Sequence, residues 1–256
     1  MATPQQDFIR DLEVFRRDCE SAAQYFYGYL AIHELARRNR KILALLNRHA
    51  LFWNTVLGGL QTSALIALGR VFDQDPRTHN IGRLLALASS NLNIFSKSSL
   101  ALRLPSVDAR ALDRLYEPVA GDFRMLKRHV AKHRLLYERN VRDIRRKMLA
   151  HAEVVDPGEI NALLSGTLVR EIQQLIVFLV SLHATLRGLF QNGLKPVLRF
   201  RRYSVARMRR LPSLAARSYD IHERMVGEAA LVLLAASQPN KRLQPSAVGA
   251  MMSRRG

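Results

Sequence analysis

Apolar side chains recur every three to four residues along the first part of the chain. Phe8, Leu12 and Phe15 begin this stripe, which has the spacing that places side chains on one face of an α-helix. Thr3 and Pro4 precede it; Thr is a preferred N-cap residue, and Pro is favoured at the first helical position. The pattern predicts one long amphipathic helix that ends near residue 38.

The same periodicity continues through most of the sequence. It predicts a short helix and a long one within residues 42–72, and further helices over residues 81–88, 108–152, 159–191 and 213–237. The Ser- and Asn-rich residues 89–106 are predicted to form the longest internal loop. No segment keeps the strict alternation that is typical of a strand. The predicted fold class is therefore all-α, an antiparallel helical bundle.

These patterns also suggest how the chain is divided. A helical domain is predicted over residues 1–237, with a core at about 5–193, and a basic C-terminal extension over 195–237 that ends in an extra helix. Residues 238–256 lack apolar periodicity, so they are predicted to form a disordered basic tail.

The sequence favours a cytoplasmic protein. Cys19 is the only cysteine, which excludes an intrachain disulfide, and the N-terminus lacks the basic start and apolar block of a signal peptide. The apolar stretches 50–72 and 168–190 contain several polar residues. We therefore expect them to be buried bundle helices rather than membrane spans.

The charge is strongly positive. The chain has 40 Lys and Arg against 21 Asp and Glu, a net charge of +19. The extension is especially basic and places Phe200 and Tyr203 among arginines, a composition that can hold RNA phosphates and stack bases, although a solvated connector has the same composition. The charge predicts a polyanionic partner, and RNA is the partner that we expect.

The most informative segment is residues 145–151, Arg-Arg-Lys-Met-Leu-Ala-His. A titratable imidazole close to guanidinium groups can perform acid–base chemistry on a phosphodiester. Two further segments precede it in the sequence: residues 52–54, Phe-Trp-Asn, and residues 68–73, Leu-Gly-Arg-Val-Phe-Asp.

With these three segments, the chain resembles the HEPN superfamily of small helical proteins, and its AbiU-like, abortive-infection branch in particular, over roughly residues 5–235. The resemblance implies metal-independent RNA cleavage of the toxin or phage-defence type. In it, a ribose 2′-hydroxyl attacks the adjacent phosphorus, His151 transfers a proton and Arg145 neutralises charge on the phosphate. Arg146, which is assigned to the catalytic site with these two residues, stands where the family often has Asp or Asn.

The spacing of these residues also predicts an assembly. On a helix, neither Arg145 nor Arg146 lies on the same stripe as His151. A second copy of the chain would bring the groups together on one phosphate, so we expect a homodimer with a composite site.

Other polar residues are assigned to supporting roles. Asp143 is expected to pair with Lys147, four residues later, and Arg70 with Asp73, one helical turn later. RNA-binding roles are assigned to six basic residues: Lys127, Arg128, Lys132, Arg134, Arg142 and Lys147.

No metal ion or other cofactor is predicted. His129 and His133 have the four-residue spacing of a two-histidine metal face, but basic residues surround them and no third, carboxylate ligand is evident. Two other readings of the chain stay open: a catalytically silent HEPN module that binds RNA or a nucleotide, and a helical interaction protein. An antitoxin is a further possible partner.

Overall fold

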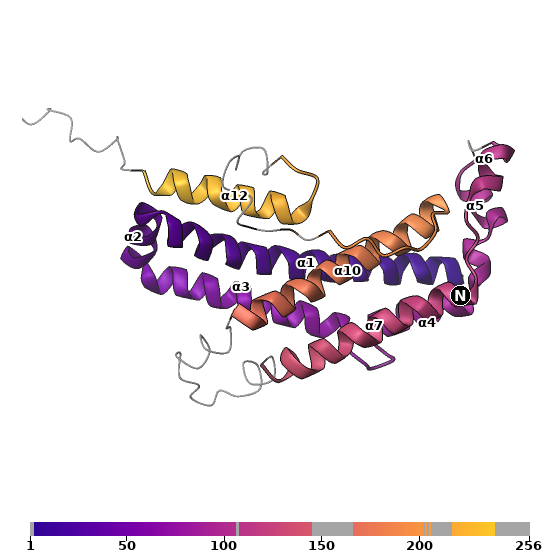
Figure 1. Cartoon of the computed structure of the whole chain (residues 1–256), viewed down its shortest axis with the longest axis horizontal. Helices are drawn as coiled ribbons and strands as arrows, with labels where there is room; N and C mark the ends of the chain where they lie inside the picture. The colour runs from indigo at the N-terminus through magenta and orange to yellow at the C-terminus, as the bar shows by residue number, and fades with distance from the viewer. Residues whose placement is uncertain are drawn as a thin grey trace, which may run out of the picture.

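The fold is known from a computed structural model, which describes residues 3–105, 108–144, 166–201, 203, 205 and 217–238. These residues form helices, turns and connecting segments, and none of them is in a strand. The prediction of an all-α fold is therefore confirmed. Long helices run side by side along the molecule, with a group of short helices at one end (Figure 1).

The helices follow one another in a simple order. Their bounds are α1 (Pro4–Arg38), α2 (Arg40–Arg48), α3 (Ala50–Val71), α4 (Ile81–Ser90), the 3-10 helix η1 (Leu92–Phe95), α5 (Lys97–Arg103), α6 (Ala109–Arg114), α7 (Ala120–Asn140), α10 (Gly166–Asn192) and α12 (Ile221–Ala236).

The start of α1 shows why the chain becomes helical there. The Thr3 hydroxyl accepts a hydrogen bond from the Gln6 backbone N–H at 3.2 Å, and the Gln6 side chain accepts one from the Thr3 N–H at 2.9 Å. This capping box satisfies two N–H groups that a helix start otherwise leaves unpaired. The helix ends at Arg38, as predicted.

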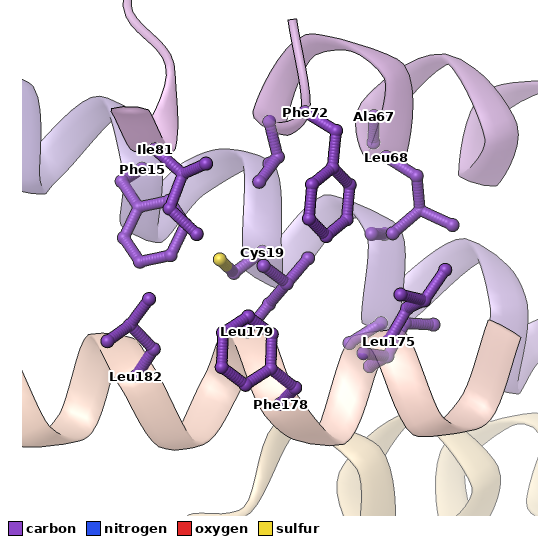
Figure 2. Packing of buried hydrophobic residues seen from close by; sticks show 14 of the residues in the cluster. Phe15, Cys19, Ala67, Leu68, Phe72, Ile81, Leu175, Phe178, Leu179 and Leu182 are labelled. Atoms are coloured by element: carbon purple, nitrogen blue, oxygen red, sulfur yellow. The ribbon is translucent and has the colours of Figure 1, made fainter. Parts of the chain in front are cut away.

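The core forms where α1, α3 and α10 meet, with α4 and α7 closing its sides. Figure 2 shows side chains of α10 directed toward α1 and toward the end of α3. They are Leu175, Leu179 and Leu182, and they face Phe15, Cys19, Ala67, Leu68 and Phe72; Phe178 is buried in the same cluster. Because all of these side chains are removed from water, burial of apolar surface is the main source of stability.

The two apolar stretches differ in burial. Ala50–Val71 and Leu168–Asn192 are each long and apolar enough to cross a membrane, judged by length and composition alone. In α10 most of this stretch is buried inside the bundle, as predicted. The prediction is wrong for the first half of α3, where Leu51 is 86% and Phe52 is 60% exposed, because the buried residues of this helix begin only at Ala64.

The loop predicted over residues 89–106 is largely helical. It contains η1 and α5, and the Ser96 hydroxyl caps α5 by accepting a hydrogen bond from the Ser99 N–H at 3.2 Å. Ile94, Phe95 and Leu100 from this segment are buried. The prediction failed because helices of four to seven residues are too short to show a clear period.

Other predictions of helices hold in part. Residues 42–72 form α2 and α3, Asn80 caps α4, and Pro118 separates α6 from α7. The last helix is shorter than predicted, since α12 begins at Ile221. Residues 145–165 and nearly all of the predicted tail lie outside the described residues.

A buried carboxylate ties α1 to the segment that leads into α4. Asp11 is 2% exposed, and its Oδ1 lies 2.7 Å from Nδ1 of His79 while its Oδ2 accepts from Nε of Arg83 at 2.9 Å. Both carboxylate oxygens are thus satisfied, which a buried charge requires.

Replacing Asp11 should therefore destabilise the bundle. We expect Asp11→Ala to lower the free energy of unfolding by about 2–3 kcal/mol, because Arg83 and His79 lose a buried partner although both are partly solvated. Asp7→Ala, which removes an exposed pair with Arg10 on the same helix, should cost about 1 kcal/mol or less. Urea denaturation measures both, and equal losses would contradict the structural role of Asp11.

Candidate nucleic-acid interface

The basic residues assigned to RNA lie mostly on α7. Asp122 fixes the start of this helix, since its Oδ2 accepts hydrogen bonds from the Val119 N–H at 2.9 Å and the Tyr116 hydroxyl at 2.8 Å. The buried stripe of α7 consists of Phe123, Leu126, Val130, His133 and Tyr137. Because this stripe faces the core, the charged positions between its members lie at the edges of the helix.

The structure places these basic residues on two sides of α7. Lys127 donates to the Ser89 hydroxyl at 2.7 Å, so it faces the end of α4, and Arg134 lies beside Gly82 near the start of α4. Arg128 and Lys132 are exposed and are four residues apart, which puts them on one face of the helix. The predicted set therefore does not form one continuous patch.

A small groove brings two of the predicted residues together. It has a volume of about 270 Å³ and lies between the end of α3 and the end of α7, with Asp73 and Arg142 among its lining residues. The rings of Phe72 and Tyr137, also in its lining, stack with centroids 5.0 Å apart. Arg142 is three residues before Arg145 in the sequence, so the groove is close along the chain to the segment of the predicted catalytic residues.

The predicted pair of Arg70 and Asp73 is not formed. Nε of Arg70 donates instead to Oδ1 of Asp18 on α1 at 2.8 Å. The Asp73 carboxylate is used within its own turn, where it accepts from the Gln74 N–H at 2.7 Å and the Thr78 hydroxyl at 3.1 Å. Arg70 is therefore a tie between α3 and α1, and Asp73 stabilises a turn.

The catalytic residues of the prediction are not placed by the structure. Arg145, Arg146 and His151 lie outside the described residues, as does Lys147, which was assigned to RNA binding and to a pair with Asp143. Asp143 itself is exposed.

A cavity close to the predicted interface lies between α7 and α10. Its volume is about 650 Å³, within the range of small-molecule pockets. His129, Lys132 and His133 line it from α7, and Arg170, Gln173, Gln174 and Val177 from α10; Phe200 completes the lining. Of the predicted RNA-binding residues, Lys132 alone is in this lining.

His133 forms a fixed part of the cavity wall. Its ring stacks on Phe178 with centroids 3.8 Å apart and an angle of 2°, and its Nδ1 lies 2.8 Å from the His129 carbonyl oxygen. A carbonyl oxygen only accepts, so Nδ1 carries the hydrogen and Nε2 of the neutral ring is an acceptor. Burial lowers the pKa of His133, which keeps the ring neutral at pH 7.

Phe200 reaches the cavity because the chain turns back after α10. Gly193 adopts a φ of 56°, a left-handed conformation that glycine allows at a helix end. The following segment runs back along α10, with the Thr185 hydroxyl donating to the Val197 carbonyl oxygen at 3.2 Å and Nε2 of Gln173 donating to the Tyr203 carbonyl oxygen at 2.5 Å. The sequence predicts Phe200 as one of the aromatic residues among arginines that can stack bases, but not that it lies beside α7 and α10.

No group of three or more His, Cys, Asp or Glu side chains that could hold a metal ion occurs in the part of the chain that the structure describes. In the cavity, Nδ1 of His133 is engaged by a backbone carbonyl, so a two-histidine ligand set with His129 would need Nε2 of His133.

The chain matches a known protein family. The AbiU2 family of HEPN domains matches residues 5–207, which include α1 to α10 and the segment from Arg145 to His151. No curated protein and no solved structure matched the chain.

The state of His133 leads to a pH prediction. Its pKa is lowered below the ordinary value of 6.5, so its contribution to stability is present above about pH 6.5 and is lost as the pH falls toward the folded-state pKa. We expect the ring to titrate below pH 6.5 in an NMR titration. When the pH is lowered from about 7 to about 5, the free energy of unfolding should fall less for His133→Gln than for the wild type. An NMR titration midpoint of His133 above the ordinary value would contradict this.

Proposed function

Because the chain belongs to the AbiU2 family of HEPN domains, we propose that it is a metal-independent endoribonuclease of the abortive-infection type. It acts on RNA in the cytoplasm as a toxin or phage-defence effector, under the control of an antitoxin partner. The observation that carries the proposal is the segment from Arg145 to His151, which lies inside the matched residues 5–207 and holds a histidine six residues after an arginine.

The proposed reaction uses the RNA strand's own nucleophile. The ribose 2′-hydroxyl attacks the adjacent phosphorus, and the bond from phosphorus to the 5′-oxygen of the next nucleotide breaks. His151 transfers the proton, and Arg145 neutralises charge that develops on the phosphate oxygens. The products are a cyclic phosphate and a 5′-hydroxyl, so no outside water or redox partner is consumed.

The distribution of charge supports RNA as the substrate. In α7, which precedes this segment, there are six Lys and Arg but two Asp and Glu. Both acidic residues have other partners, since Asp122 caps the helix and Glu138 accepts from Gln74 at 2.6 Å. The cations of α7 are thus available to attract phosphates.

A second copy of the chain would complete the site. At about 100° per residue, a helix separates Arg145 from His151 by about 240° around its axis, so one helix does not present both side chains to one phosphate. The exposed apolar side chains Leu51 and Phe52 form the surface that we propose is covered in the dimer, because such exposed side chains are favourable interface residues.

The arginine at position 146 favours a second candidate function. A cation at the position where the family often has Asp or Asn adds phosphate attraction but supplies no carboxylate or amide. A domain of this kind that binds RNA without cutting it is the alternative, and the cleavage experiment separates the two.

Cleavage of RNA should depend on two residues and on no metal. We expect His151→Ala and Arg145→Ala each to lower the cleavage rate about a hundredfold or more, since each removes a group that acts on the transferred phosphate. Arg146→Ala should have a milder effect, through weaker phosphate attraction. Cleavage is measured on labelled RNA with and without EDTA, with circular dichroism as the control for folding.

Two results would reject the nuclease proposal. They are loss of wild-type cleavage in EDTA, and cleavage by His151→Ala at the wild-type rate. RNA binding without any cleavage would support the silent RNA-binding domain.

The assembly has a separate test. We expect sedimentation to show a dimer at micromolar concentration and the double substitution Leu51→Glu, Phe52→Glu to shift it to monomer, because charge replaces apolar surface. Leu135→Glu, at another exposed leucine on α7, should leave the dimer intact. A wild-type monomer at this concentration would contradict the composite site.

A further inference from the structure

The cavity between α7 and α10 has the charge of a site for an anion. Lys132, Arg170 and His129 line it, and the lining residues that the structure describes include no Asp or Glu. None of the three forms an ion pair within the described part of the chain. A phosphate bound here would contact side chains that do not first have to break an ion pair with a carboxylate.

The same cavity offers groups that suit a planar base. Phe200 is 51% exposed, and its ring centroid lies 6.5 Å from that of His133. An exposed aromatic face of this kind stacks with bases of any sequence. Nε2 of His133 and the side-chain oxygen of Gln173 are acceptors, and the side-chain amide of Gln174 adds both donors and an acceptor for the edge of a base.

These groups are held in place by contacts of their own. The stack on Phe178 fixes the ring of His133, and the hydrogen bond to the Tyr203 carbonyl holds Gln173 against the returning segment. Nε2 of Gln173 also donates to the Tyr27 hydroxyl at 3.3 Å. The wall is therefore organised before a ligand binds, which reduces the entropy lost on binding.

We propose that this cavity binds one unpaired nucleotide of an RNA strand. Its base stacks on Phe200 and contacts His133 and the glutamines, and its phosphate lies among Lys132, Arg170 and His129. A base must leave the helical stack to enter, so the site selects single-stranded RNA over a duplex. The inference deepens the proposed function by naming the form of RNA, and it rests on RNA being the ligand.

The test measures binding without cleavage. The full chain with His151→Ala is titrated into a fluorescein-labelled single-stranded oligoribonucleotide of about ten nucleotides, and separately into the matching duplex. Phe200→Ala, Lys132→Gln and Arg170→Gln are then added one at a time. Arg124→Gln is the charge control, because Arg124 is an exposed arginine of α7 outside the cavity lining. Val197→Ala is the control on the returning segment.

Each result has a stated meaning. We expect Phe200→Ala to weaken single-strand binding about tenfold, the effect of one lost stacking contact. Lys132→Gln and Arg170→Gln should weaken it several-fold and reduce the salt dependence by about one ion. Arg124→Gln should weaken binding less than Lys132→Gln does, because it removes only phosphate attraction from outside the cavity, and Val197→Ala should bind as the parent does. The proposal is overturned if Phe200→Ala matches Val197→Ala, or if the duplex binds as tightly as the single strand.

Further arms separate this proposal from the nuclease proposal. Adenosine monophosphate that binds as tightly as the oligonucleotide would indicate a site for free nucleotides and overturn the RNA-strand assignment. Pocket-dependent RNA binding by a wild-type chain that does not cleave would reject the nuclease proposal alone. Wild-type cleavage with binding that the pocket variants do not change would reject the pocket alone.

Discussion

Burial of one face of α1 is the constraint on which the rest of the structure depends. This helix has 35 residues and packs against α2, α3, α4, α10 and α12. Its buried face contains Phe8, Phe15 and Ala22, and no single neighbour is long enough to cover it. Several helices must therefore be placed around it, which gives a bundle rather than separate helical hairpins.

Buried polar groups on α1 decide where these helices are placed. Asp11 contacts His79 and Arg83 beside α4, Asp18 pairs with Arg70 of α3, and Tyr27 accepts from Gln173 of α10. Apolar burial alone tolerates small shifts along a helix, whereas a buried carboxylate is costly unless its particular partner is in place. These contacts fix α4 and α10, and α7, which packs between them, forms the cavity wall with α10.

The long helices could be predicted from the sequence because their periodicity extends over many turns. What could not be predicted depends on contacts between distant residues. Arg70 and Asp73 have a favourable local spacing, but Asp18 on another helix takes the arginine, and the turn after α3 uses the aspartate. His133 and Phe200 are 67 positions apart in the sequence, and only the turn at Gly193 brings them to one cavity.

Net charge predicts a polyanionic partner but not the place on the molecule where that partner binds. On α1 the exposed and half-exposed acidic residues are matched by arginines three or four positions away, as in the pairs of Arg16 with Glu13 and Glu20. The two charges of such a pair cancel at short range, so the pair attracts charged ligands only weakly from solution. On α7 the basic residues outnumber the acidic ones, and both acids there have hydrogen-bond donors of their own. Excess positive charge therefore remains along α7, the helix that lines the cavity and precedes the segment of Arg145 and His151.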